Sequence, residues 1–320
     1  MSATPHDALF KETFSVPERA AEELRAVLPP AFVALLNWAS IEDVSSSFVD
    51  EALGQRHSDL MFRVEASGAG SVWLYLLFEH QSEPDTLMPW RLLGYMTAQW
   101  KAALAGAKLP LIVPVVLHHG AGGWTVARAF EDLYDVPPAV LDAIGPHALR
   151  FTPVLDDLAQ SPTALIHARR MSAAARLVLL ALRAARGEDD IDRLADEWLP
   201  LIDEVAAAEP DLRALVVLVR YTEIVRGPRD ASRLTERVIS HLGARGENAM
   251  HTITDTIREE GRQEGRAEGR VEVVIKQLAL KFGPLDQAAL AAIRSADLAR
   301  LDSFAERILF AESLDAVLAP

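Results

Sequence analysis

Two acidic residues and an amide flank a glycine-rich turn in the first third of the chain. Asp59 precedes one apolar run, and Glu79 and Gln81 follow a second apolar run beyond the turn. If the runs form a hairpin centred on Ala69, Asp59 lies directly across from Glu79, because both are equally far from Ala69. Gln81 then points to the same face as Glu79, since side chains alternate along a strand. Like charges held this close repel each other, so the spacing predicts a divalent cation between them.

The predicted site suits Mg²⁺, which prefers hard oxygen ligands, needs few protein contacts and keeps several waters. The opposite face of the same hairpin is apolar, which favours a central place in a sheet. That face comprises Phe62, Val64, Leu74, Leu76 and Phe78. The alternative interpretation is that Asp59 and Glu79 are ordinary polar ends of two strands.

The elements around this hairpin predict a small mixed sheet flanked by helices. Short helices are expected within residues 5–38, the last of them over 31–38, and a strand over 44–53. Residues 87–104 have the spacing of an amphipathic helix, and 110–119 form an apolar run typical of a strand buried on both faces. The order of helix, three strands, helix and strand is that of an α/β fold.

Two histidines end the last of these strands. His118 and His119 are consecutive, so their side chains point to opposite faces of the sheet. We therefore do not expect both to bind one metal ion.

The middle of the chain predicts helices alone. Apolar residues recur at helical spacing over 164–186, 191–205, 212–225 and 232–242. After a short repeat over residues 258–270, the pattern of residues 271–320 predicts a small helical module at the C-terminal end.

The repeat Arg258–Arg270 reads REEGRQEGRAEGR, in which glycine, arginine and glutamate each recur every four residues. On a helix this period gives adjacent small, basic and acidic stripes. One interpretation is a solvated linker, because each glycine costs a helix about 1 kcal/mol relative to alanine. The other is a helix whose glycine stripe lets a partner helix approach closely, which suggests self-association of the chain.

Composition limits the class of protein. The chain has 320 residues, no cysteine and a net charge of −14, which argues against a general nucleic-acid binder with a basic face. Without cysteine, thiolate metal sites and disulfides are excluded. Charged residues interrupt the start of the chain before any apolar stretch, and no window suits a membrane span, so we expect a cytoplasmic protein without membrane contact.

Five segments, taken in order, resemble one known family. They are His6–Lys11, Ser58–Leu60, Glu79–Ser82, Pro89–Met96 and His119–Gly120. Together they are similar to the recombination-promoting nuclease/putative transposase (Rpn, YhgA-like) family of the PD-(D/E)XK nuclease superfamily. The repeat and the C-terminal module resemble the tails common in that family.

The resemblance implies a PD-(D/E)XK restriction-endonuclease-like mixed sheet with flanking helices, an αβββαβ core, as the fold class. We expect this nuclease-like domain over residues 1–155 and a helical region that packs on or follows the core over 156–245. The repeat, as linker or helix, then occupies 246–270, and the helical C-terminal module 271–320.

The resemblance also implies catalytic roles. Asp59 matches the superfamily aspartate, Glu79 matches the acidic residue of the (D/E)XK element, and Gln81 stands where lysine is usual. Gln81 can hold water or phosphate by hydrogen bonds, but it carries no positive charge. Asp59, Glu79 and the backbone carbonyl of His80 are then the expected ligands of Mg²⁺ or Mn²⁺.

Three further residues are candidates on the same grounds. Asp7 would be an outer metal ligand, or simply an acid favoured at the start of a helix. Lys11 and Arg91 would contact phosphates of the substrate, or be ordinary surface cations.

The resemblance implies a metal-dependent DNA endonuclease linked to recombination and mobile elements, with DNA as partner and self-association through the helical C-terminal region. The alternative is a nuclease fold that no longer cuts and acts as a DNA-binding or protein-interaction module. The acidic net charge and Gln81 favour the alternative, whereas two intact carboxylates favour the enzyme.

Overall fold

The computed structural model divides the chain into two compact units, Met1–Glu247 and Asn248–Pro320. The residues that it describes are 4–44, 60–67, 71–79, 85–103, 109–185, 187, 189–208, 212–248, 269–271, 273–283, 285, 289–290, 293, 296, 298–311 and 313–318. Residues 156–245, which we expected to form a helical region, belong to the first unit together with the sheet.

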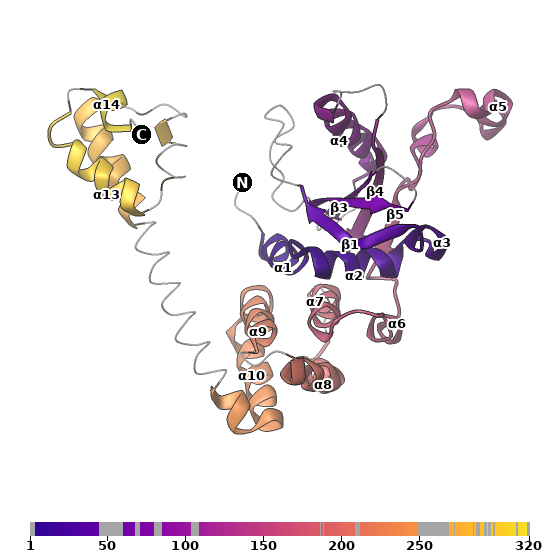
Figure 1. Cartoon of the computed structure of the whole chain (residues 1–320). Coiled ribbons are helices and arrows are strands. Elements are labelled where there is room, and N and C mark those ends of the chain that lie inside the picture. The colour runs from indigo at the N-terminus through magenta and orange to yellow at the C-terminus, as the bar shows by residue number, and fades with distance from the viewer. Residues whose placement is uncertain are drawn as a thin grey trace. The chain divides into compact units, whose positions relative to one another are not determined.

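The first unit contains a five-stranded mixed sheet in its described part, with the strands in sequence order (Figure 1). The first two pairings are antiparallel and the last two are parallel. The strands are β1 (Leu36–Asp43), β2 (Leu60–Ala66), β3 (Ser71–Glu79), β4 (Leu111–His118) and β5 (Val154–Asp157). The predicted mixed sheet with flanking helices is confirmed.

One face of the sheet packs against α4 (Met88–Ala103), which lies above the sheet in Figure 1. The helix has an apolar stripe because Met88, Leu92 and Met96 are spaced at about one turn each. These side chains join residues of β2, β3 and β4 in one cluster, which comprises Met61, Trp73, Met88, Leu92, Met96, Ile112, Val116 and Trp124. Burial of this apolar surface is the main force that fixes α4 on the sheet.

The other face is covered by α1 (Pro5–Phe14) and α2 (Pro17–Val27) (Figure 1). Both helices begin with proline, which suits the first helical position because its missing N–H would have no partner there. Phe10, Phe14 and Leu24 are fully buried. A four-residue helix, α3 (Pro30–Val33), follows and leads into β1.

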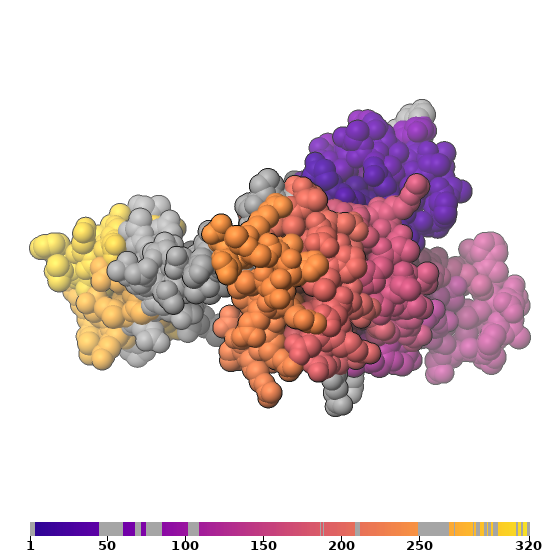
Figure 2. Space-filling model, turned by 90° about the horizontal axis from the view of Figure 1, so that it is seen from below, coloured from indigo at the N-terminus to yellow at the C-terminus, as the bar shows by residue number. Residues whose placement is uncertain are grey.

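A layer of helices lies beyond α1 and α2, and its side chains form a continuous surface (Figure 2). Its α7 and α9 pack against α1, while α10 packs against α8 and α9. The helices are α6 (Thr163–His167), α7 (Ala173–Ala184), α8 (Ile191–Ala208), α9 (Arg213–Arg226) and α10 (Pro228–Leu242). The predicted all-helical middle of the chain therefore exists, but the single helix expected over 164–186 is two, α6 and α7.

The break between α6 and α7 is fixed at Ser172. Ser172 adopts an extended backbone and its hydroxyl accepts a hydrogen bond from the Ala175 N–H, which caps α7. The Glu22 carboxylate on α2 accepts hydrogen bonds from both the N–H and the hydroxyl of Ser172, at 2.9 and 2.7 Å. The start of α7 is thus fixed by a contact with a distant helix.

An excursion between β4 and β5 projects from the sheet in both views (Figures 1 and 2). It carries two short 3₁₀ turns, Phe130–Leu133 and Gly145–His147, and the helix α5 (Pro138–Ile144). None of the residues of α5 is buried.

Two strands differ from what the sequence predicted. Residues 36–38 belong to β1 and not to a helix over 31–38, and β5 was not expected at all. The strand expected over 44–53 falls largely outside the described residues. Both misses concern strands with mixed polar and apolar residues, which give no clear periodicity.

The second unit has an apolar cluster of its own. Its described helices include α13 (Leu298–Arg307) and α14 (Leu314–Leu318). The cluster comprises Val274, Leu278, Ile293, Leu301, Phe304, Ile308 and Val317. Most of the repeat Arg258–Arg270, with all the residues before Gly269, lies outside the described residues. No helix in the described part of either unit has the length and apolar character of a membrane span.

Candidate active site

Three polar residues lie in a row where the parallel strands end. Glu79 is the last residue of β3, and its Cα is paired with that of His118 in β4. His118 is paired in turn with Asp157, the last residue of β5. Open α/β sheets bind their ligands at the carboxyl ends of parallel strands, so this edge is the candidate active site.

The register of the central hairpin differs from the prediction by two residues. Leu60 pairs with Leu76, and Glu65 pairs with Ser71, so the pairing is symmetric about position 68. A hairpin centred on Ala69 would have paired Leu60 with Phe78, and the direct Asp59–Glu79 pairing rested on that register. A shift by two keeps the same residues on the same face, because side chains alternate with a period of two.

Most of the predicted catalytic residues and metal ligands are not among the described residues. Asp59, His80 and Gln81 lie outside them, and for Glu79 the structure gives the backbone position alone. Within the described part of the chain, no three His, Asp or Glu side chains are grouped so that they could hold a metal ion. The catalytic and metal-binding roles of these residues stay predictions.

Asp7 is buried at the start of α1, with 5% of its surface exposed. Its Oδ2 accepts hydrogen bonds from the N–H and the hydroxyl of Thr4, at 3.1 and 2.9 Å, while its own N–H donates to the Thr4 hydroxyl at 3.2 Å. This reciprocal arrangement is a capping box, which stabilises the first turn of a helix. The structure thus supplies a structural role for Asp7, and its role as an outer metal ligand stays a prediction.

The two candidate phosphate contacts are not brought together. Lys11 is exposed on α1, whereas Arg91 lies on α4, on the opposite side of the sheet (Figure 1). Arg91 is largely buried and forms an ion pair of 2.6 Å with Asp85 just before α4. Contact of either cation with DNA stays a prediction.

The two histidines at the end of β4 have different surroundings. His118 is fully buried, and its ring meets that of Trp124 nearly edge-on, with the centroids 5.3 Å apart. His119 is 1% exposed, its Nδ1 lies 3.2 Å from the carbonyl oxygen of Leu182, and its ring lies 4.9 Å from that of His6. They thus contact different elements, as the alternation of a strand requires.

Asp157 closes the end of the sheet. Its Oδ2 accepts a hydrogen bond of 2.7 Å from the Trp124 N–H, and its Oδ1 accepts one of 3.2 Å from the Ala159 N–H. The carboxylate therefore ties the loop after β4 to the end of β5, a structural role at the candidate edge.

A buried ion triad lies one residue away from Asp157, and sequence reasoning missed it. Both terminal nitrogens of Arg169 donate to Asp156, each at 2.7 Å, and Nη1 also donates to the Glu23 carboxylate at 3.1 Å. Glu23 is fully buried and Asp156 is 5% exposed. The three residues come from α2, β5 and the turn before α7, so no local sequence pattern could have shown the triad.

Burial governs the acidity of this triad. Loss of solvent raises the pKa of Glu23 well above its usual value, the negative charge of Asp156 raises it further, and Arg169 opposes both. Burial alone would lower the pKa of Arg169, but its hydrogen bonds with Asp156 and the charges of both acids outweigh that and raise it. The guanidinium therefore stays charged.

A family model described as putative transposase, YhgA-like, matches residues 4–213. The chain belongs to this family of YhgA-like putative transposases. The matched part runs from the start of α1 to the start of α9, so it includes the whole sheet and the ion triad.

Curated relatives of this YhgA-like protein have names that refer to nucleases. Recombination-promoting nuclease RpnD of Escherichia coli O157:H7 is 36% identical over 123 residues, which are 38% of this chain and 47% of RpnD. Recombination-promoting nuclease RpnA of E. coli K12 is 38% identical over 121 residues, 37% of this chain and 41% of RpnA. The match thus spans less than half the length of either relative.

A third relative is named as inactive. The putative inactive recombination-promoting nuclease-like protein YjiP of E. coli K12 is 38% identical over 97 residues, 30% of this chain and 93% of YjiP. No solved structure matches the chain.

Proposed function

We propose that this YhgA-like protein is a metal-dependent DNA endonuclease of PD-(D/E)XK type with a role in recombination. The observation that carries the proposal is the position of Glu79 at the carboxyl end of β3, the central strand of a mixed sheet in a chain whose relatives are named nucleases. An acid at this edge is suited to metal-assisted hydrolysis of a phosphodiester.

The donor set fits Mg²⁺ or Mn²⁺. The carboxylates of Asp59 and Glu79 and the carbonyl of His80 are hard oxygen donors, with Asp7 as an outer ligand in the same proposal. When bound, the ion supplies positive charge that stabilises developing phosphate charge and makes water more acidic.

In this proposal the remaining site residues position the water and contact the phosphates. Gln81 orients the attacking water or the scissile phosphate by hydrogen bonds, because an amide cannot take up a proton at neutral pH. Lys11 and Arg91 contact phosphates on their own sides of the sheet. The helical C-terminal region would supply self-association.

The second candidate function is a nuclease fold that no longer cuts and serves as a DNA-binding or protein-interaction module. Gln81 in place of lysine and the names of inactive relatives support it. The two candidates differ in whether the site binds metal and turns over DNA.

Plasmid nicking with and without Mg²⁺ tests the proposal. We expect cleavage by the natural sequence to require metal and to fall at least about a hundredfold in Asp59→Ala and in Glu79→Ala, since each removes charge stabilisation of the transition state. Glu65→Ala is the matched control, because Glu65 is exposed on the neighbouring strand β2. Equal cleavage by all four proteins would contradict the assignment of the site.

Thermal unfolding separates the two candidate functions. A metal that binds the folded state raises the midpoint by mass action, so we expect millimolar Mn²⁺ to stabilise the natural sequence and Glu65→Ala but not Glu79→Ala. No shift in any of the proteins would favour the non-cutting module.

A further inference from the structure

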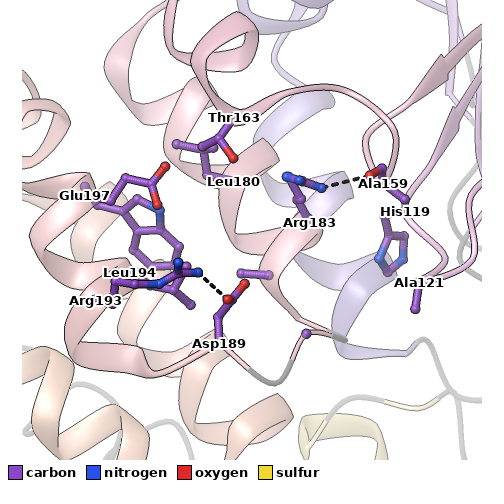
Figure 3. A pocket seen from close by; sticks show the side chains of 13 residues that line it. His119, Ala121, Ala159, Thr163, Leu180, Arg183, Asp189, Arg193, Leu194 and Glu197 are labelled. Carbon is purple, nitrogen blue, oxygen red and sulfur yellow. Dashed lines mark hydrogen bonds and ion pairs between the residues drawn. The ribbon is translucent and has the colours of Figure 1, made fainter.

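A pocket of about 400 Å³ opens where the helical layer meets the ends of β4 and β5. His119 and Ala159 line it from the strand ends, and most of the other lining residues lie on α7 and α8 or in the segment between them (Figure 3). Its volume lies in the range that small-molecule sites occupy, roughly 300–1,000 Å³. The pocket therefore adjoins the edge of the sheet at which α/β proteins bind their ligands.

One wall presents the guanidinium of Arg183. Nη1 of Arg183 donates hydrogen bonds to the carbonyl oxygens of Leu158 and Ala159, at 3.1 and 3.0 Å. Among the described residues, no Asp or Glu lies within ion-pair distance of its guanidinium. The other arginine of the pocket, Arg193, does form an ion pair, with Asp189. The two carbonyls fix the orientation of Arg183, while its remaining nitrogens stay available as donors for an anion.

His119 lies on the same wall (Figure 3). A carbonyl oxygen can only accept, so Nδ1 of His119 must donate to the carbonyl of Leu182. In the neutral ring Nε2 is then an acceptor, and in the charged ring it is a second donor. The end of α7 thus positions both groups, because Leu182 precedes Arg183 directly.

The opposite wall carries two carboxylates and one arginine, which is paired with one of them. Asp189 and Glu197 line it together with Arg193 (Figure 3). Arg226 supports this wall from behind, since its guanidinium donates to the backbone carbonyls of Ala184 and Asp189. Carboxylates on a rigid wall accept hydrogen bonds from amino groups, as they do from the exocyclic amine of cytosine.

From these observations we propose that the pocket binds a nucleotide, with the phosphate against Arg183 and the base toward Asp189 and Glu197. An inorganic anion would satisfy the cation alone and leave most of the pocket unfilled. A nucleotide carries the anion at one end and amino donors at the other, which matches the charges of the two walls. The nucleotide is either part of a DNA strand, in which case the proposal rests on the nuclease function, or a free ligand.

Calorimetric titration of the whole chain in EDTA tests this inference independently of metal-dependent cleavage. The probes are 2′-deoxycytidine 5′-monophosphate, deoxycytidine, inorganic phosphate and thymidine 5′-monophosphate. We expect the cytidine nucleotide to bind at least about tenfold more tightly than deoxycytidine or phosphate, because only it meets both walls. We also expect it to bind more tightly than the thymidine nucleotide, which has no exocyclic amine.

Two substitutions locate the binding. Arg183→Gln should weaken the cytidine nucleotide about tenfold or more, whereas Arg170→Gln should not, since Arg170 is exposed outside the pocket. Glu197→Gln should abolish the preference over the thymidine nucleotide. It tests the pocket even if Arg183→Gln fails to fold, because Glu197 is exposed at the surface.

Absence of binding by the cytidine nucleotide at millimolar concentration would overturn the inference. So would binding that neither Arg183→Gln nor Glu197→Gln changes. A single-stranded oligodeoxycytidylate that binds more tightly than the mononucleotide identifies a DNA strand as the source, and weaker binding identifies a free nucleotide. Loss of nicking with retained nucleotide binding would contradict the nuclease function and leave this site standing.

Discussion

The two faces of the sheet bury different chemistry, although they share the same strands. Toward α4 the sheet buries an apolar cluster that includes Met61, Trp73 and Leu92. Toward α2 the sheet also buries Asp156, which contacts Arg169 and Glu23. Apolar packing tolerates many neighbours, whereas a buried charge tolerates only a partner placed to neutralise it. The charged face therefore requires elements that place Glu23 and Arg169 beside Asp156.

At the ends of β4 and β5, consecutive residues also point to different faces of the sheet and meet different neighbours. Asp156 joins the buried triad, while Asp157 caps the loop near Trp124. His118 packs on Trp124, while His119 turns to the pocket beside α7. The end of each strand therefore contributes side chains to both faces of the sheet, and the helical layer borders one of these faces.

The largest effect should come from removal of the cation of the triad. We expect Arg169→Ala to lower the free energy of unfolding by about 3–5 kcal/mol, because it leaves two buried acids without compensation. Arg170→Ala, one residue along and exposed, should change it by less than about 0.5 kcal/mol. Urea unfolding followed by circular dichroism measures both. If both variants lowered the free energy of unfolding equally, the triad would not be what stabilises this face of the sheet.

A somewhat smaller effect is expected on the apolar face. Leu92→Ala should cost roughly 2–5 kcal/mol, from the lost burial and the cavity left in the cluster around α4. Leu87 is 54% exposed, so Leu87→Ala serves as the control and should cost under about 1 kcal/mol. The same urea titrations apply. If Leu92→Ala were neutral, α4 would not be held by the packing described.

The smallest effect concerns pH and arises from Glu23 on the charged face. Because the pKa of Glu23 is raised in the folded state, its favourable contribution is complete below the usual value of 4.5 and is lost as pH rises through the raised value. Over that interval the folded chain binds more protons than the unfolded chain, so stability should fall with rising pH.

Glu23→Gln should remove this slope, since glutamine fills the same space and does not titrate. Leu92→Ala, on the other face, should lower stability while it keeps the slope. Urea unfolding from about pH 5 to about pH 8 compares the three proteins. A slope that persists unchanged in Glu23→Gln would assign it to another group.

Local patterns predicted three helices that bury one side and a strand that is buried on both faces. The helix expected over 87–104 is α4, and the apolar run over 110–119 is β4. The helices expected over 191–205 and 212–225 are α8 and α9. In each helix the side chains that face the core recur at the helical period, and in β4 a continuous apolar run reflects burial on both faces, so each pattern is visible without the partner.

The short strand β5 shows why other elements were missed. Its sequence, Val154-Leu155-Asp156-Asp157, ends in two acids and has no apolar periodicity. It is a strand because β4 supplies backbone partners and because Arg169 compensates one acid while the Trp124 N–H satisfies the other. These partners are distant in the sequence, so the strand depends on the tertiary fold.

The sequence by itself determined that a carboxylate ends the central strand and that a mixed sheet with flanking helices surrounds it, because alternation and helical spacing are local properties. Only the tertiary structure decided the register of the hairpin, which is shifted by two residues from a centre at Ala69. It also decided that Arg183, His119 and Glu197 surround one pocket. Register and pocket both arise from packing between distant segments, whose energies no local spacing encodes.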